Sequence, residues 1–394
     1  MEIYRRLKIT SALMIAALYL SSCGSTIKVS ENKRQEIQKN VEFERAVEIV
    51  SEEPVTSAQQ VLTPPHDTPI AGKDSAPATK KEEVPTAKKA PETKSPAKNN
   101  TTTLVRTKEV GKVDGKVPSS KKGAEKKSEV ASKAEAAATK PMRRQPELED
   151  DEGFDGRRPV VDPFRVGEVI THDVHYFKVS AGELKLKVEP FAQVNGRRSY
   201  TFATEIETSS MFSAVYSVED RAVTHVDYYD MVPRTYSLSV KESSQVREVR
   251  NVFNFSTLKG TLWEKKITKQ KGEENKKMEW DILPFSQNVF SAIFYMRNFA
   301  WRDGKEYSFV VSHDKENLVF KGKVIRREKL KTKVGQFNAI VVKPEFTLQG
   351  IFKPVGDIFI WLSDDDRKYV LRIESKIKIG TLVSEVIDIK PGYP

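Results

Sequence analysis

One residue of this chain has a type and a position that suggest covalent chemistry. It is Cys23, the only cysteine among 394 residues, and it follows Leu20, Ser21 and Ser22 at the end of an apolar run over residues 9–20. A basic head precedes the run and contains Arg5, Arg6 and Lys8. A basic head and about a dozen apolar residues are typical of a secretory signal peptide. The run is shorter than the roughly 20 residues of a permanent membrane helix. The sequence therefore predicts export, with the only thiol placed where the export signal ends.

The stretch from Leu20 to Cys23 resembles the lipobox of bacterial lipoproteins. In that class the cysteine thiol receives a diacylglycerol, the preceding peptide is removed, and the new amino terminus receives a fatty acid such as palmitate. The resemblance implies that residues 1–22 are a signal peptide and that acyl chains on Cys23 hold the mature protein at a membrane. Gly24 stands where an acidic residue would retain Gram-negative lipoproteins at the inner membrane. We therefore expect a cell-envelope protein that is lipid-anchored in the outer membrane and faces the periplasm.

Two alternatives for the N-terminus remain open. In one, Cys23 is a chance cysteine in an ordinary secretory signal, and in the other the apolar run is an uncleaved anchor. In each case one cysteine cannot form an internal disulfide. Any exported domain therefore depends on its hydrophobic core for stability.

The residues between the anchor and position 160 are mostly Lys, Ala, Pro, Thr, Glu and Ser. Such a composition offers too little apolar surface to offset the entropy cost of ordering. We therefore predict a disordered linker over residues 23–160, with a mean span of about 60–70 Å by random-coil scaling. Within it, a sparse apolar stripe over residues 30–53 predicts one short, mostly solvated helix.

The formal net charge of the chain is +11. A basic balance can indicate nucleic acid as a partner, but the export signal argues against it. The anionic partners left for an envelope protein are phospholipid headgroups, lipopolysaccharide phosphates and wall polymers. A role of the charge in solubility alone is an equally good interpretation.

From residue 161 onward, apolar and polar residues alternate with a period of two, for example over residues 184–188 and 371–377. This pattern predicts antiparallel strands with one buried and one solvated face. Residues 286–299 instead have apolar side chains at helical spacing, with Ser286 as the expected N-cap. We therefore predict a mainly β domain over 161–394. Its curved antiparallel sheet would form an open barrel or a clam, with one covering helix.

Several short motifs of this domain occur in the order found in a known family. They include Ala181-Gly182, Ser217-Val218-Glu219-Asp220, Ser291-Ala292-Ile293-Phe294, Val334-Gly335-Gln336-Phe337 and Ile360-Trp361-Leu362-Ser363. With them, residues 164–389 resemble the bacterial envelope family catalogued as domain of unknown function 3108. The resemblance implies an exported β-rich domain with a curved sheet, and it brings no known activity or catalytic residues.

Few residues of the domain suggest catalysis or metal binding. His172 and His175 are three apart on a predicted strand, so their imidazoles should lie on opposite faces. His225 and Asp227 come without a nucleophile elbow. The three aspartates at 364–366 lack the other ligands of a calcium loop and predict a polar hairpin tip. We therefore expect no enzyme, no metal and no cofactor.

Two functions of different class follow. In the first, the domain is a binding module that holds a lipid or other amphiphile, or an anionic envelope polymer. An internal cavity lined by Phe202, Phe309, Ile360 and Ile373 would support it. In the second, the domain is a non-catalytic scaffold of envelope assembly, with the sheet filled by its own side chains. No feature of the sequence specifies an oligomeric state.

Overall fold

The computed structural model describes residues 37–52, 152–176, 179–313, 315–348, 351–353, 357–377 and 380–393. Leu20, Ser21, Ser22 and Cys23 lie outside this range, as does most of the predicted linker. In the part of the chain that the structure describes, no helix is long and apolar enough to cross a bilayer.

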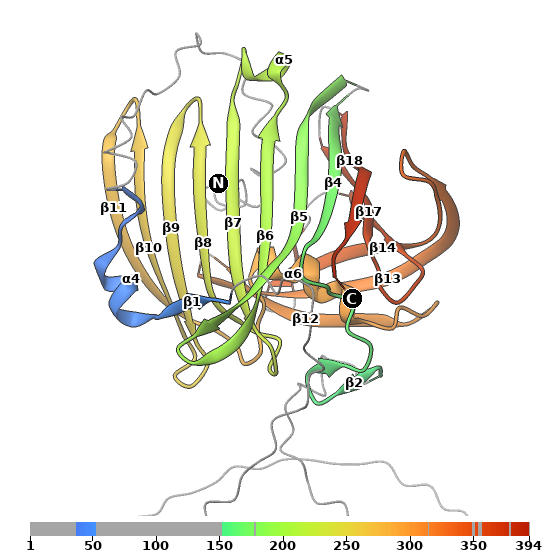
Figure 1. The fold of residues 1–394 in the computed structure, drawn as a ribbon, viewed down its shortest axis with the longest axis horizontal. Coiled ribbons are helices and arrows are strands. Elements are labelled where there is room, and N and C mark those ends of the chain that lie inside the picture. The colour runs from blue at the N-terminus through green and yellow to red at the C-terminus, as the bar shows by residue number, and fades with distance from the viewer. Residues whose placement is uncertain are drawn as a thin grey trace, which may run out of the picture. The chain divides into compact units, whose positions relative to one another are not determined.

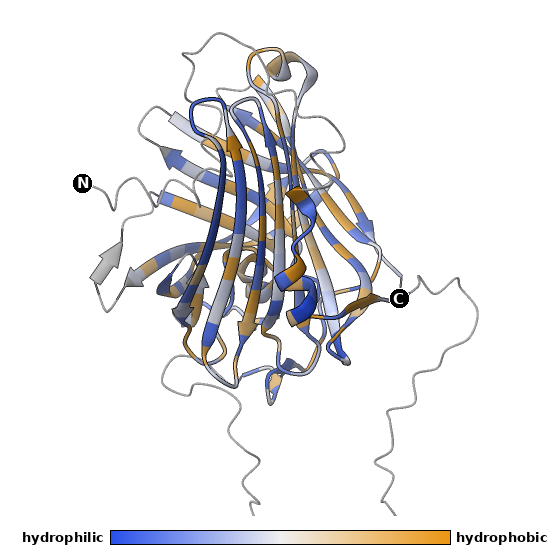
Figure 2. Cartoon of the chain, turned by 90° about the vertical axis from the view of Figure 1, so that its left-hand side faces the viewer, coloured by the Kyte–Doolittle hydropathy of each residue, from blue (hydrophilic) through white to orange (hydrophobic). Residues whose placement is uncertain are grey.

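One large antiparallel sheet forms the domain (Figure 1). Its first part consists of β4 (Glu168–Tyr176), β5 (Val179–Val194), β6 (Arg197–Thr208), β7 (Val218–Asp227), β8 (Pro233–Glu242), β9 (Gln245–Asn254), β10 (Lys259–Thr268) and β11 (Gly272–Asp281). Its second part consists of β12 (Glu306–His313), β13 (Glu316–Lys331), β14 (Gln336–Leu348), β15 (Ile351–Lys353), β16 (Asp357–Ser363), β17 (Val370–Ile377) and β18 (Gly380–Pro391). Apolar and polar residues alternate along these strands, as predicted (Figure 2).

The sheet is strongly curved and remains open. Its path runs from β11 through β4, which pairs with β18, and then to β12. The edge strands β11 and β12 approach each other at one end, where Trp280 Nε1 donates to Ser312 Oγ at 3.0 Å. The prediction of an open, curved antiparallel sheet with a covering helix is confirmed.

The covering helix, α6 (Val289–Tyr295), continues into a turn of 3-10 helix, η2 (Met296–Asn298). The helix begins later than predicted, because Asn288 and not Ser286 is its N-cap. Gln287 is still extended and its backbone bonds to both Val310 and Ser312 of β12. The chain can therefore turn into a helix only at Asn288, whose side chain accepts two backbone hydrogen bonds of the first turn.

The helix lies between the two parts of the sheet (Figure 1). Phe294 stacks on Phe202 of β6, with ring centroids 4.3 Å apart, and Tyr295 meets Phe309 of β12 edge-on at 5.1 Å. These rings belong to the larger hydrophobic cluster, which joins β4–β6 to the second part of the sheet. A second cluster covers β7–β11 and includes Phe290 of α6. We call the face that contacts α6 the inner face and the opposite one the outer face.

Two segments of the predicted linker belong to the folded domain. Residues 37–52 contain α4 (Val41–Ala46) and β1 (Ile49–Ser51), and β1 pairs with the end of β5. Residues 154–159 form the small hairpin of β2 (Phe154–Asp155) and β3 (Arg158–Pro159). The linker prediction is therefore wrong at both ends. The prediction rested on the average composition of the segment, which does not reveal a few apolar side chains that pack on the domain. Phe43 and Val47 are such side chains, and they are buried in a third cluster.

Candidate functional site

The four residues predicted to line a cavity lie together in the larger hydrophobic cluster. Phe202, Phe309, Ile360 and Ile373 are at most 7% exposed. The Phe202 ring is covered by Phe294, and the Phe309 ring stacks on Phe320 with centroids 4.5 Å apart. A ligand cavity at these residues stays a prediction, and the packing around both phenylalanines argues against it.

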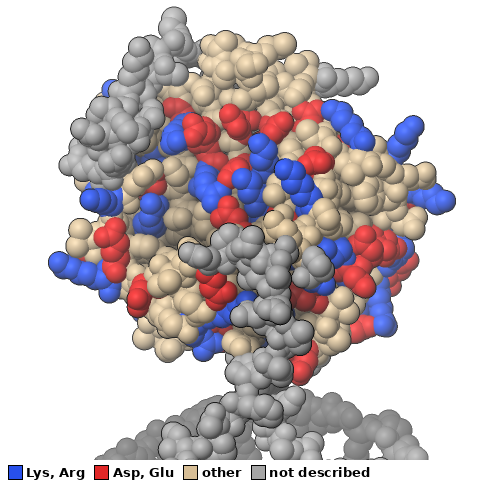
Figure 3. All heavy atoms as spheres, viewed as in Figure 1, with Lys and Arg blue, Asp and Glu red and all other residues tan. Residues whose placement is uncertain are grey.

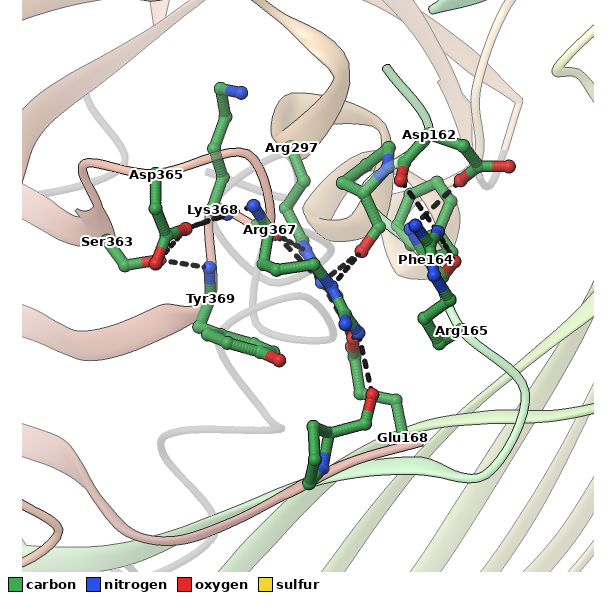
Figure 4. Close-up of polar contacts among 12 residues, drawn as sticks. Asp162, Phe164, Arg165, Glu168, Arg297, Ser363, Asp365, Arg367, Lys368 and Tyr369 are labelled. Atoms are coloured by element: carbon green, nitrogen blue, oxygen red, sulfur yellow. Dashed lines mark hydrogen bonds and ion pairs between the residues drawn. The ribbon is translucent and has the colours of Figure 1, made fainter. Parts of the chain in front are cut away.

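A buried ion cluster lies beside this packed region (Figure 4). Arg297 of η2 and Glu168 of β4 are each 1% exposed, and two nitrogens of the guanidinium contact the two carboxylate oxygens at 2.6 and 3.0 Å. Arg367 adds a third contact, with its Nη2 2.5 Å from Glu168 Oε2. Bidentate contacts of this kind are the strongest type of charge-assisted hydrogen bond.

The backbone completes this cluster. Arg297 also donates to the carbonyl oxygens of Pro163 and Arg367, and Arg367 donates to that of Pro391. The turn that carries Arg367 is fixed by the Asp365 carboxylate, which accepts from the backbone N–H groups of Arg367 and Lys368. The cluster thus ties η2, β4, β18 and the β16–β17 turn together. Its charges are already paired, so we assign it to stability.

The inner face of β7–β11 differs, because its rows of side chains change from mostly apolar to mostly charged. The row beside α6 consists of Thr224, Tyr236, Asn251, Leu262 and Met278. The next row along the strands consists of Ala222, Leu238, Val249, Glu264 and Lys276. The third row consists of Asp220, Val240, Arg247, Lys266 and Glu274. Successive rows lie about 7 Å apart along the strands.

An acidic pair lies at the charged end of these rows. Burial, with a smaller contribution from the neighbouring Glu242 carboxylate, raises the pKa of Asp220 to about 7. The backbone N–H of Lys241 donates to Asp220 Oδ1 at 3.2 Å, and Tyr216 Oη donates to Glu242 Oε2 at 2.8 Å. A carboxyl group with this pKa exchanges its proton near neutral pH, so the charge of this end of the face depends on pH.

Two further polar groups complete the inner-face site, which we define as Asp220, Glu242, Arg247, Asn251 and Glu264. Arg247 and Glu264 form a half-buried ion pair on adjacent strands. Asn251 is 0% exposed and lies in the second hydrophobic cluster's row between Tyr236 and Leu262. Neither its Nδ2 nor its Oδ1 has a hydrogen-bond partner among the described residues. A buried polar group without a partner costs about 1–3 kcal/mol.

This arrangement fits binding better than catalysis. The site combines buried apolar side chains, one buried amide whose polar atoms have no partner among the described residues, and a rim that carries both charges. No group of three His, Cys, Asp or Glu side chains in the described ranges could hold a metal ion. Sequence reasoning missed the site because its polar residues share a face only once the register of β7–β11 is known. The only signal was the presence of polar residues at alternating positions of β9.

The histidines that sequence analysis considered have separate environments. His172 is fully buried with Nδ1 3.1 Å from Ser384 Oγ, whereas His175 is partly exposed with Nδ1 3.6 Å from Asp173. His225 contacts Thr235 Oγ1 at 2.9 Å, and burial lowers its pKa to about 4. The Asp227 carboxylate is held by two arginines, Arg197 and Arg234.

The outer face carries interspersed positive and negative side chains (Figure 3). Lys187 and Arg221 both contact Glu205, and Arg221 also contacts Glu189 at 2.7 Å. On the second part of the sheet, Lys321 and Lys323 share Glu306. These basic side chains have acidic partners within the fold and do not form a free anion site.

Comparison with known proteins identifies the family but not the activity. No curated protein matches the chain. Among solved structures, it is similar to a β-barrel-like protein of domain of unknown function DUF1849 from Brucella abortus, at 11% identity and a TM-score of 0.39, over 58% of this chain and 99% of that one. It is also similar to a protein from Bacteroides fragilis described as exported, with a YmcC-like fold, at 12% identity and a TM-score of 0.27, over 58% and 97%. A third is a protein from Parabacteroides distasonis described as a lipoprotein, at 11% identity and a TM-score of 0.22, over 57% and 95%.

The family itself is shown by the match of a sequence model. The model is described as a protein of unknown function, DUF3108, and it matches residues 171–387, which is more than half of the chain. The match covers nearly all the strands of the large sheet. The chain therefore belongs to the DUF3108 family, as its ordered motifs predicted.

Proposed function

We propose that this protein is a lipid-anchored protein of the cell envelope whose domain binds an amphiphile at the inner-face site. The anchor is Cys23, preceded by Leu20, Ser21 and Ser22 after a signal-peptide run. Two or three acyl chains would give stable membrane attachment. Gly24 supports the outer membrane as the destination, with the domain in the periplasm.

The observation that carries the binding proposal is the buried amide of Asn251 within an apolar row. A partner for this amide would have to enter the hydrophobic surface formed by Leu262, Met278 and their neighbours. From the row of Asn251 to the row of Arg247 is about 13 Å along the strands. An amphiphile of that length would place its apolar part against the row of Asn251 and its polar group at the charged rim, beside Arg247.

The rim favours an anionic or zwitterionic head group. Arg247 provides a guanidinium, which binds phosphate or carboxylate through two parallel hydrogen bonds. Its present partner is Glu264, so an incoming anion would compete with that carboxylate. When Asp220 is protonated, it carries no negative charge that would repel an anionic head group. Its raised pKa allows this protonation near neutral pH.

A scaffold without a small ligand is the second candidate. The observation in its favour is the filled interior of the larger cluster, where α6 covers Phe202 and contacts Phe309. On this interpretation the open sheet is held by its own side chains and presents its surface to other envelope proteins. The two candidates differ in whether the domain carries an amphiphile when isolated.

The binding proposal is tested by native mass spectrometry of the full-length protein extracted from its own host envelope. We expect the parent to retain an amphiphile, and Asn251→Leu and Arg247→Met to lose it. The matched control is Arg221→Met, which removes an arginine from the outer face of β7 and should leave the bound mass unchanged. A parent that carries no ligand under gentle extraction would favour the scaffold.

The anchor is tested separately by Cys23→Ser. We expect this variant to lack acyl chains, to lose the processing seen in the parent and to leave the outer-membrane fraction. A variant that stays with membranes and is processed like the parent would rule out lipidation as the anchor.

A further inference from the structure

The N-terminal segment returns to the outer face of the sheet and is fixed there. In β1, Ile49, Val50 and Ser51 pair with the last three residues of β5, which are Ala192, Gln193 and Val194. Backbone hydrogen bonds extend the pairing at both ends, from Glu52 N–H to Phe191 O at 2.8 Å and from Asn195 N–H to Glu48 O at 2.9 Å. We call residues 37–52 the strap.

The helix of the strap adds a hydrophobic contact. Phe43 and Val47 are at most 9% exposed and pack with Val252 and Trp263 on the outer face of β9 and β10. The Phe43 ring meets the Trp263 indole edge-on with centroids 6.1 Å apart. Glu42 accepts hydrogen bonds from both Trp263 Nε1 at 2.8 Å and Lys277 Nζ at 2.7 Å.

The sheet explains why the strap binds at this place. β5 contains a bulge between Glu189 and Ala192, and its last residues extend beyond the part that pairs with β4. Without the strap, this backbone would be an unpaired strand edge. Trp263 would also be an exposed aromatic side chain on a charged face. The strap covers both features.

We propose that the strap, and not the long lysine-rich segment, is the mechanical link between the membrane anchor and the domain. This inference rests on the proposed acylation of Cys23. Fourteen positions separate Cys23 from Ile37, the first residue of the strap. This length reaches at most about 50 Å when extended, or about 20 Å as a random coil.

The consequence is a different placement of the domain at the membrane. The outer face of β9–β11, to which the helix of the strap binds, is then the surface nearest the lipid headgroups. Residues 53–151 connect two fixed points of the same domain, because Glu152 at their far end is held by Lys305 and Arg302. They form a loop in the connectivity of the chain, and they do not set the distance to the membrane.

The test is a site-specific cut in the full-length, membrane-bound protein. A protease site placed near residue 100 separates the acylated N-terminal piece from the domain. We expect the cut domain to remain in the membrane fraction, because the strap stays bound to the sheet. A site placed between residues 25 and 35 should instead release the domain completely.

Two variants make the test specific for the strap. Phe43→Ala removes its main hydrophobic contact, and after the cut near residue 100 this variant should be released. The matched control, Val41→Ala, changes an exposed valine of the same helix and should stay bound. Release of the parent domain by the cut near residue 100 would overturn the proposal. Loss of the uncut parent from membranes would instead refute the anchor.

Discussion

Two buried polar sites of this sheet, one beside each hydrophobic cluster, differ in how their polar atoms are partnered. Beside the larger cluster, Glu168 and Arg297 are fully buried and paired through two contacts, with Arg367 and backbone carbonyls as further partners. In the second cluster, Asn251 is equally buried and has no partner within the described range. Unpartnered amide atoms also occur at Asn298, next to Arg297, so the lack of partners alone does not single out Asn251. Asn251 differs in lying within an apolar row of the inner face near a charged rim, and this combination is why we expect a ligand there.

The ionisable groups follow the same division. Around Glu168 the charges are opposite and close, so burial is compensated. Around Asp220 the largest effect of a neighbouring charge comes from another carboxylate, that of Glu242, with Arg247 acting in the opposite direction, and burial makes the charged form costly. The ion cluster around Glu168 therefore stabilises the domain. The groups around Asp220 and Asn251 lower its stability, and a bound ligand could offset that cost.

The largest expected effect is the loss of one member of the buried ion pair. Arg297→Met leaves the Glu168 carboxylate buried beside Arg367 alone, and we expect the free energy of unfolding to fall by about 3–5 kcal/mol. Urea denaturation of the domain in the intact chain measures this change. Combining it with Glu168→Leu should recover part of the loss. Lys259→Met, at an exposed ion pair, is the control and should leave stability unchanged.

A smaller and pH-dependent effect is expected at the second cluster. The pKa of Asp220 is about 7 in the fold against an ordinary value of 3.8. Between these values the folded state binds more protons than the unfolded state, so this group costs stability as pH rises and the full cost is present above pH 7. Asp220→Asn should therefore stabilise the domain by about 2 kcal/mol at pH 8 and have no effect near pH 4. Equal gains at both pH values would contradict the assignment.

The smallest expected effect concerns the amide without a partner. Asn251→Leu removes a buried group that lacks hydrogen bonds and should stabilise the ligand-free domain by about 1 kcal/mol. Thermal unfolding after delipidation measures it, with Asn275→Leu at an exposed position of β11 as control. A loss of stability would mean that Asn251 is satisfied within the fold, and the contrast between the clusters would disappear.

The sequence predicted the fold class well, because the alternation of apolar and polar residues with a period of two is a local pattern. It placed the covering helix but not its first residue, since Gln287 is held extended by β12, which follows later in the chain. The helix of the strap, α4, lies within residues 30–53, where a short helix was predicted, but its docking on the sheet was not predicted, for a similar reason. The few apolar residues of the strap become buried only when Trp263 and the end of β5 form the surface on which they pack. That surface comes from residues much later in the chain.

The inner-face site could not be found from the sequence either. Asp220 lies on β7, whereas Arg247 and Asn251 lie on β9, so the three residues share one face only through strand register. The predicted cavity residues were correctly assigned to the interior, but spacing alone could not show that Phe294 of the helix would cover Phe202.

The most direct test of the binding site uses photoreactive methionine incorporated throughout the full-length protein in its host. Met278 lies in the row of Asn251, whereas Met231 and Met296 lie in the packed larger cluster and Met211 is exposed. After irradiation, peptide mass spectrometry should find an amphiphile adduct on Met278 and none on Met231 or Met296. Adducts spread equally over the four methionines, or absent from Met278, would contradict the site.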